Sequence, residues 1–355
     1  MLGAHVLVIS YDRQLAGVTS RPIHEAVLGG GQAVLLFFAL SGYLLFWPFA
    51  RQLFDGGRRV DLATYARNRA LRLLPLYFFV VAVVLVLKED GGGWEQWLLL
   101  ASFNQVHDTG AFEVVPVTWS VAVEVHFYIL LPLLAAAIGA VAKASLARAA
   151  GLLAILGCAS LAVRVLTVYD GSWSSDPWRF SLPGMLFMFV AGMAVALLRI
   201  AWERRPPRLP GWAAGSDAWL LAALVLWYAG IQTYRTEVLV VVAAFLVVGA
   251  CALPLRSGAL VRIFDTRALA LVGIASYSLY MWHYPVLEWM RGWYPEASDF
   301  RLLALAAVPL CLAIAAASYL VVERPFLALR RRWGSTTAEA PPEQRPASPL
   351  PAAAK

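Results

Sequence analysis

Several ionisable side chains stand inside segments of the sequence that are otherwise apolar. Glu124 and His126 lie in TWSVAVEVHFYILLPLL, and His283 lies in SYSLYMWHYPVLEWM. His5 lies in the opening run, MLGAHVLVISYD. A carboxylate or an imidazole is expensive to place in hydrocarbon and usually has a functional reason to be there. Histidine suits proton transfer near neutral pH, although aromatic neighbours make interfacial anchoring an open alternative for His126 and His283.

A second group with chemical potential is the arginine pair in YARNRALRLLPLY. Arg69 and Arg72 are three residues apart, so on a helix they share one face. Each guanidinium presents a planar fork of donors that suits a phosphate or pyrophosphate group. The alternative is that both arginines only anchor the end of a membrane span.

The composition indicates that a bilayer surrounds the elements that carry these groups. Hydrophobic residues make up 61% and charged residues 14% of the 355 residues, which is far from a soluble chain. Cys158, Cys251 and Cys311 lie in apolar runs, and their spacing suggests neither a metal site nor a disulfide framework. No bound cofactor is expected. The net charge of +7 comes from short basic clusters between apolar runs, which favours membrane orientation over nucleic-acid binding.

Apolar runs predict an all-α bundle of about ten membrane-spanning helices, each of about 20 residues. The full-length candidates are 33–50, 73–88, 118–142, 147–166, 182–199, 216–233, 237–254, 268–290 and 301–321, and 1–11 is a partial tenth. The stretch 94–105 is too short to cross and is predicted to be interfacial or re-entrant. Residues 1–333 then form one membrane domain, and the Pro/Ala-rich tail 334–355 is predicted to be disordered.

The basic clusters orient these spans. If 94–105 does not cross, the five clusters within 51–72, 143–148, 199–208, 256–267 and 324–332 fall on one side, and both chain ends are predicted to be cytoplasmic. The first helix then covers only about 15 Å from Met1, half the hydrocarbon thickness. We therefore expect the natural sequence to continue upstream, with His5 near mid-membrane. The alternative is that this segment only dips into the interface.

Five motifs in one order resemble a known family. They are FFALSGYLLFWPF, RNRALRLLPLY, TWSVAVEVHFYILLPLL, SYSLYMWHYPV and VERPF, and the likeness covers about residues 1–333. Together they resemble the membrane-bound acyltransferase family 3, which includes bacterial sugar O-acetylases and macrolide O-acyltransferases. The resemblance implies a multi-pass protein of the bacterial cytoplasmic membrane. It also implies transfer of an acyl group, acetyl first of all, from cytoplasmic acyl-CoA to a hydroxyl of a carbohydrate, glycolipid or secondary metabolite.

The resemblance also implies roles for individual residues. His5 matches the catalytic histidine of the first helix, whose partner arginine would precede Met1. We expect His5 to act as the base, with either that arginine or Glu124 orienting it. Arg69 and Arg72 match the paired arginines, which implies binding of the acyl donor. Further site residues that the resemblance marks are Ser41, Gly42, Trp119, Ser120, Tyr280 and His283.

Two other classes of function compete with this interpretation. Intramembrane histidine and glutamate residues with Gly/Pro breaks would also serve a secondary transporter or flippase. Against this, the two halves of the sequence show no convincing duplication. A binding or sensory membrane protein is the third class, and no receptor-like segment supports it.

Overall fold

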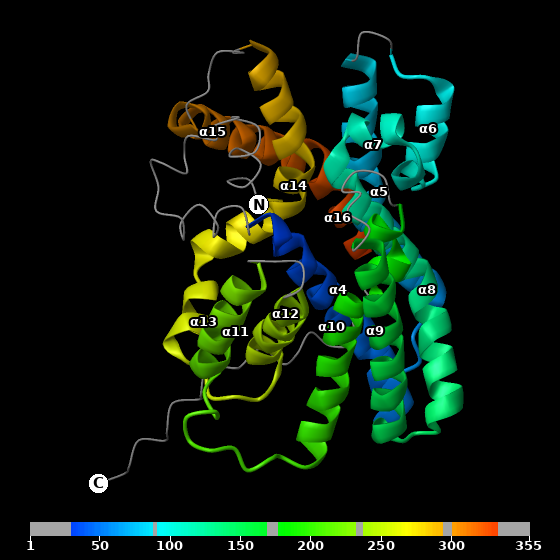
Figure 1. Cartoon of the computed structure of the whole chain (residues 1–355), viewed down its shortest axis with the longest axis vertical. Coiled ribbons are helices and arrows are strands. Elements are labelled where there is room, and N and C mark those ends of the chain that lie inside the picture. Colours follow the sequence, from blue (N-terminus) through cyan, green and yellow to red (C-terminus); the bar gives the residue numbers. More distant parts are fainter. Residues whose placement is uncertain (1–29, 88–90, 169–176, 232–236, 294–299, 333–355) are drawn as a thin grey trace.

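The computed structural model describes residues 30–87, 91–168, 177–231, 237–293 and 300–332 (Figure 1). Over these residues the secondary structure is helical, with no β-strand. Within these described ranges, six helical segments are long and apolar enough to cross a membrane: Ala33–Phe54, Leu62–Leu87, Pro116–Ala142, Leu146–Thr167, Pro177–Arg204 and Leu305–Arg330. The chain is therefore a multi-pass membrane protein, as its composition predicted.

A helix occupies most of the described part of each of the nine full-length candidate ranges. The helices are α4 (Ala33–Phe54), α5 (Leu62–Leu87), α8 (Trp119–Ala142), α9 (Leu146–Val168), α10 (Leu182–Arg204), α11 (Ser216–Gly230), α12 (Glu237–Ala252), α14 (Arg267–Trp293) and α15 (Phe300–Ser318). At 15 and 16 residues, α11 and α12 are shorter than a full span requires. The number of spans, about ten, stays a prediction. The partial candidate 1–11, with His5, and the tail 334–355 lie outside the described residues.

The segment after α5 does not cross the bundle, as predicted. Helix α6 (Trp94–Ala101) has eight residues, about 12 Å of helix. It is followed by three short pieces, η2 (Gln105–His107), α7 (Thr109–Val114) and η3 (Pro116–Thr118). The Tyr77 hydroxyl donates to the Leu100 carbonyl at 2.8 Å. The segment therefore stays beside the second half of α5 and leads directly into α8 (Figure 1).

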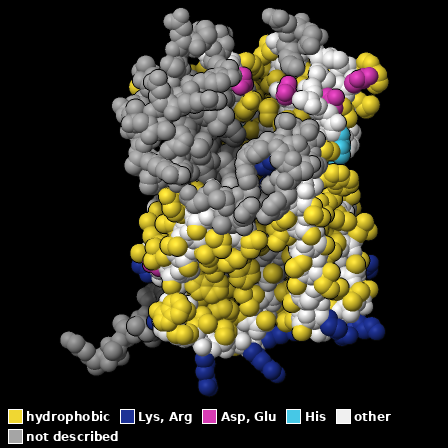
Figure 2. All heavy atoms as spheres, in the orientation of Figure 1, with side chains coloured by type: hydrophobic (Ala, Val, Ile, Leu, Met, Phe, Trp, Pro, Cys, Tyr) yellow, Lys and Arg dark blue, Asp and Glu magenta, His cyan; other side chains and the backbone are white. Residues whose placement is uncertain are grey.

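Basic side chains gather at one end of the bundle. Arg51 at the end of α4 lies 3.4 Å from Glu203 at the end of α10, and Arg256 donates to the Gly211 carbonyl at 2.9 Å. Gly139, near the end of α8, packs against Leu53 of α4. Figure 2 shows Lys and Arg at the lower end and Asp and Glu at the upper end. By the positive-inside rule we expect the lower end to face the cytoplasm, and this orientation stays a prediction.

Helix α10 lies at the centre and touches α4 backbone to backbone. A Cβ on Gly42 would lie 2.1 Å from the Phe189 carbonyl oxygen, and one on Gly192 would lie 1.8 Å from that of Ala39. Small residues let membrane helices approach in this way. Gly42 therefore has a packing role, and it fixes the face of α4 that carries its neighbour Ser41.

Two apolar cores flank helix α8. One joins α8 to α4 and α10, where Phe38, Phe189 and Phe127 stack with ring centroids 4.8 and 4.0 Å apart. The other joins α8 to α5, α14 and α15. Polar side chains between these cores are enclosed by helices on both sides.

Candidate active site

Ser41 and Glu124 form the centre of a polar cluster between the two cores. The Ser41 hydroxyl donates to Glu124 Oε1 at 2.6 Å, which joins α4 to α8. Tyr128, one turn further along α8, is close enough to the carboxyl group of Glu124 to interact with it through its side chain. Glu124 is half-buried. Sequence reasoning marked Ser41 and Glu124, and the structure brings them into contact.

The arginine pair lies inside α5, on the face that meets this cluster. Both Arg69 and Arg72 are close enough to Glu124 to interact with it electrostatically. The span was predicted to begin at residue 73, but α5 begins at Leu62, because the carboxylate of Asp61 caps a run of good helix formers. The arginines therefore lie within a helix, as predicted, and their place at the entrance of the apolar span stays a prediction.

Arg72 also contacts the C-terminal part of the chain. Its Nη1 lies 3.3 Å from Oε2 of Glu323, and its guanidinium lies 6.0 Å from the centre of the Tyr277 ring. Glu323 ends the π-helix η6 (Tyr319–Glu323), which continues into α16 (Arg324–Arg332). Sequence reasoning gave no role to Glu323, although an acidic residue in the apolar run YLVVE was a signal of the same kind as Glu124.

A proline on α8 explains why Tyr65 belongs to this cluster. Pro132 has no backbone N–H, so the carbonyl of Tyr128, four residues earlier, loses its helical donor. The Tyr65 hydroxyl donates to that carbonyl at 3.0 Å. This bond joins α5 to α8 one turn below Glu124, and the sequence alone did not suggest it.

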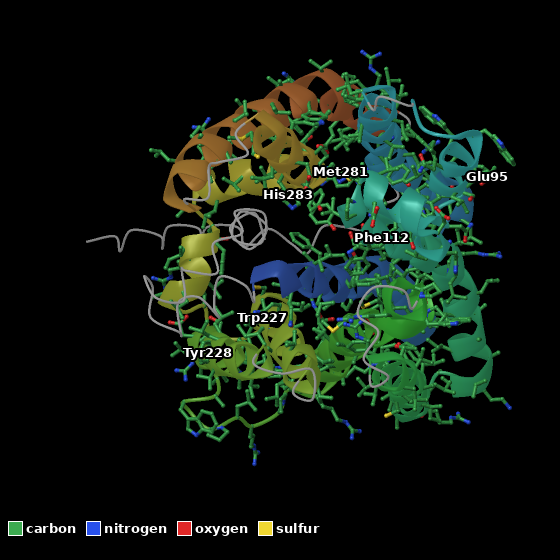
Figure 3. The ribbon with its side chains drawn as sticks, turned by 45° about the horizontal axis from the view of Figure 1, so that its top comes forward. Glu95, Phe112, Trp227, Tyr228, Met281 and His283 are labelled. Carbon is green, nitrogen blue, oxygen red and sulfur yellow. The ribbon has the colours of Figure 1, made fainter. Side chains whose placement is uncertain are left out.

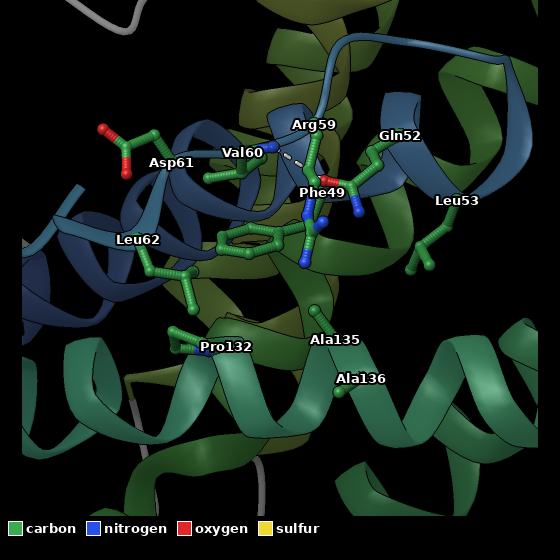
Figure 4. A pocket seen from close by; sticks show the side chains of 10 residues that line it. All are labelled: Phe49, Gln52, Leu53, Arg59, Val60, Asp61, Leu62, Pro132, Ala135 and Ala136. Atoms are coloured by element: carbon green, nitrogen blue, oxygen red, sulfur yellow. Dashed lines mark hydrogen bonds between the residues drawn. The ribbon is translucent and has the colours of Figure 1, made fainter. Parts of the chain in front are cut away.

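A pocket of about 530 Å³ opens between α4, α5 and α8 on the side of the basic end. Figure 4 shows Gln52 and Arg59 on one wall and Pro132, Ala135 and Ala136 of α8 on the other. Pro132 lies eight residues from Glu124, about 12 Å along α8. The Phe49 ring of the lining packs edge-on against Tyr65 at 5.7 Å, so the pocket adjoins the polar cluster.

The rim of the pocket carries charges of both signs. Arg59 is exposed, and Asp61 accepts hydrogen bonds from the Thr64 hydroxyl and from the backbone N–H groups of Ala63 and Thr64. The Thr64 hydroxyl, followed by these backbone donors, lowers the pKa of Asp61 below its usual range. Asp61 is therefore anionic at neutral pH and stabilises the N-terminus of α5.

Three other marked residues form a second polar group at the start of α8. The Tyr280 hydroxyl donates to the Val117 carbonyl at 2.7 Å and lies 2.5 Å from Ser120 Oγ. His283 is buried, and its Nδ1 lies 2.6 Å from the Tyr280 carbonyl oxygen, so Nδ1 carries the hydrogen. Figure 3 shows His283 on the side of α14 that faces the interior, whereas Glu95 points outward from α6. The hydroxyl of Tyr280 therefore joins α14 to the start of α8, and His283 is held within α14.

Three predicted residues remain: Trp119 and His126, which the structure describes, and His5, which it does not. Trp119 packs against Phe38 at 5.9 Å and Phe180 at 5.0 Å, so it belongs to an aromatic group beside Ser41. His126 is half-buried. His5 lies outside the described residues, and its assignment stays a prediction.

The polar site thus combines an acid, a hydroxyl and two guanidinium groups, and apolar helices enclose it. This arrangement defines a multi-pass membrane protein with a polar site inside its bundle. A sequence model of the family described as an acyltransferase domain matches residues 1–321. The chain therefore belongs to the membrane-bound acyltransferase family 3, as the five motifs predicted.

Two curated relatives carry names of the same kind. A Bacillus subtilis protein named "Putative peptidoglycan O-acetyltransferase YrhL" is 25% identical over 329 residues, which cover 84% of this chain and 50% of that protein. The Staphylococcus aureus O-acetyltransferase OatA is 22% identical over 335 residues, which cover 84% of this chain and 53% of OatA. The chain thus spans about half the length of these relatives. No solved structure matches the chain.

Proposed function

We propose that this protein transfers an acyl group, acetyl first of all, from cytoplasmic acyl-CoA to a hydroxyl of a carbohydrate or glycolipid. The observation that carries the proposal is the cluster around Glu124, where Ser41, Arg69 and Arg72 meet inside the bundle. Family membership supports the reaction class, and the names of the relatives support an acetyl group and a glycan acceptor. A secondary metabolite such as a macrolide is the second acceptor class.

A pocket and a nearby group of basic side chains support binding of acyl-CoA. The pocket between α4, α5 and α8 adjoins the cluster from the basic end, where a phosphate-bearing molecule is attracted. Among the described residues, Nε of Arg69 is buried and has no hydrogen-bond partner. This donor is suited to a phosphate oxygen of CoA, while the pantetheine arm extends toward Glu124.

The chemistry requires a base, because a neutral alcohol is a poor nucleophile toward a thioester. In the proposed reaction His5 takes the proton of the acceptor hydroxyl as its oxygen bonds to the acyl carbon. The carbon–sulfur bond then breaks, and the proton passes to the departing thiolate of CoA. Glu124 holds the imidazole in the required orientation. Arg69 and Arg72 bind the donor and take no part in the proton transfer.

The test is an acyl-transfer assay on the full chain in membranes with radiolabelled acetyl-CoA. We expect labelled product with the unaltered protein and none with His5→Ala, while the variant remains in the membrane. Wild-type turnover in the His5→Ala protein would remove His5 from the mechanism. Transport of a glycan without thioester-dependent product would instead favour the transporter.

A further inference from the structure

Glu323 is the most completely enclosed acid in the described part of the bundle. Only 3% of the residue is exposed, and both carboxylate oxygens have partners. The hydroxyl of Ser278, itself fully buried, donates to Oε1, and Arg72 lies 3.3 Å from Oε2. Glu323 is thus fixed by α14 on one side and by α5 on the other.

The ion pair between Arg72 and Glu323 is better suited to orienting the Arg72 guanidinium than to stabilising the fold. The side chain of Glu323 is 2% exposed, so its carboxylate loses nearly all contact with water. The attraction within such a pair often does no more than offset the lost hydration. The Arg72 side chain is 30% exposed and has a long stem, so it does not need Glu323 to reach a polar environment. The ion pair between Arg72 and Glu323 therefore adds little to stability. Its presence is explained if it fixes the direction in which the Arg72 guanidinium points.

The local backbone supports the same conclusion. Glu323 lies at the end of a π-helical turn, a form that is rare and occurs often at functional sites. The hydroxyl of Tyr277 donates to the Leu73 carbonyl at 3.0 Å, and the Tyr277 ring lies 6.0 Å from the Arg72 guanidinium. Arg72 is therefore held by an acid and a ring, and it also interacts with Glu124.

We propose that Glu323 is a positioning residue that binds one edge of the Arg72 guanidinium and directs its remaining N–H donors toward a phosphate group of the acyl donor. A guanidinium has five N–H donors in a fixed fork, so fixing one edge sets the direction of the others. Ser278 fixes Glu323 in turn. This inference rests on the proposed function, because it assumes that Arg72 binds the donor.

The experiment measures binding of acetyl-CoA to the full chain in lipid nanodiscs. We expect Glu323→Gln to raise the Kd for acetyl-CoA about tenfold, the effect of losing one charge-assisted hydrogen bond. In an Arg72→Gln background the same change should have no further effect, because Glu323 acts through Arg72. The matched control is Glu203→Gln, which removes the acid of an exposed arginine pair at the basic end and should leave the Kd unchanged.

The outcomes separate this inference from the proposed function. If the unaltered protein does not bind acetyl-CoA, the donor proposal fails and the inference fails with it. If it binds and Glu323→Gln binds equally well, only the inference fails. A full tenfold loss that persists in the Arg72→Gln background would also overturn it. Should Glu323→Gln not accumulate, Ser278→Ala decides, because weaker binding supports the inference and unchanged binding overturns it.

Discussion

Helices α4 and α10 are in close backbone contact at Gly192, so a side chain at this position should disturb both the fold and the polar cluster. In Gly192→Ala the new Cβ would lie 1.8 Å from the Ala39 carbonyl oxygen, whereas an ordinary van der Waals contact begins at 3.4 Å. The shortfall is 1.6 Å. Both atoms are fixed to helix backbones, so no side-chain rotation relieves the clash. The two helices must move apart.

This movement reaches the site through Ser41, two residues from Ala39 on α4. If α4 takes up most of the 1.6 Å, the 2.6 Å bond from Ser41 to Glu124 stretches beyond the length of a hydrogen bond. We expect a loss of stability of about 1–3 kcal/mol, which is typical of overpacking. A misplacement of about 1 Å can lower turnover by about 100-fold, and we expect a loss of that order.

The assay combines thermal unfolding in detergent with acetyl transfer in membranes. The matched control is Gly151→Ala on the exposed face of α9, where no atom lies within 4 Å of the new Cβ. This control should be neutral or more stable by up to about 1 kcal/mol, since alanine favours helix over glycine. Wild-type melting temperature and turnover in Gly192→Ala would refute the reasoning.

Three further predictions concern the site and its supports. Glu124→Gln should lower turnover by about 100-fold or more while the protein stays folded, and wild-type activity would exclude Glu124 from the mechanism. Tyr280→Phe removes the hydrogen bond to Val117 and should reduce the free energy of unfolding by about 1 kcal/mol, measured by thermal melting. Folding lowers the pKa of the Asp61 carboxyl group, so the ionised carboxylate stabilises the folded state. This stabilisation is fully present above the pKa of the unfolded chain, about 3.9, and is lost as the pH falls through the lower pKa of the folded state. Asp61→Asn should therefore lower the melting temperature at pH 7 and lose this effect below about pH 4, and a difference independent of pH would contradict the assignment.

Local patterns in the sequence predicted the helices well. Apolar length alone located all nine full-length candidates, and the short polar-flanked stretch at 94–105 was correctly predicted not to cross. The apolar run predicted a span from residue 73, whereas helix α5 begins at Leu62, because the arginines and Asn68 interrupt the apolar run without interrupting the helix. Hydropathy finds the part of a helix that suits lipid, whereas caps and helix propensity decide where the helix begins.

The candidate site could be predicted only in part. Intramembrane charge and the family motifs marked Glu124 and the arginine pair, but no periodicity relates Arg72 to an acid 251 residues away. The bond from Tyr65 to Tyr128 depends on Pro132 and on the register between two helices, which the sequence does not specify. The pocket depends on how α4, α5 and α8 pack together. Its apolar lining residues cannot be distinguished in the sequence from other apolar residues of a membrane helix.

The contact between α4 and α10 also has a consequence for biosynthesis. The hydrogen bond from Arg199 to Tyr43 on these two helices joins residues 156 positions apart. At a translation rate of about 5–20 residues per second, α10 is synthesised roughly 8–30 s after α4. During that interval the glycine face of α4 meets lipid or other helices of the nascent chain. The packing that supports the bond from Ser41 to Glu124 is thus completed only after α10 has been synthesised.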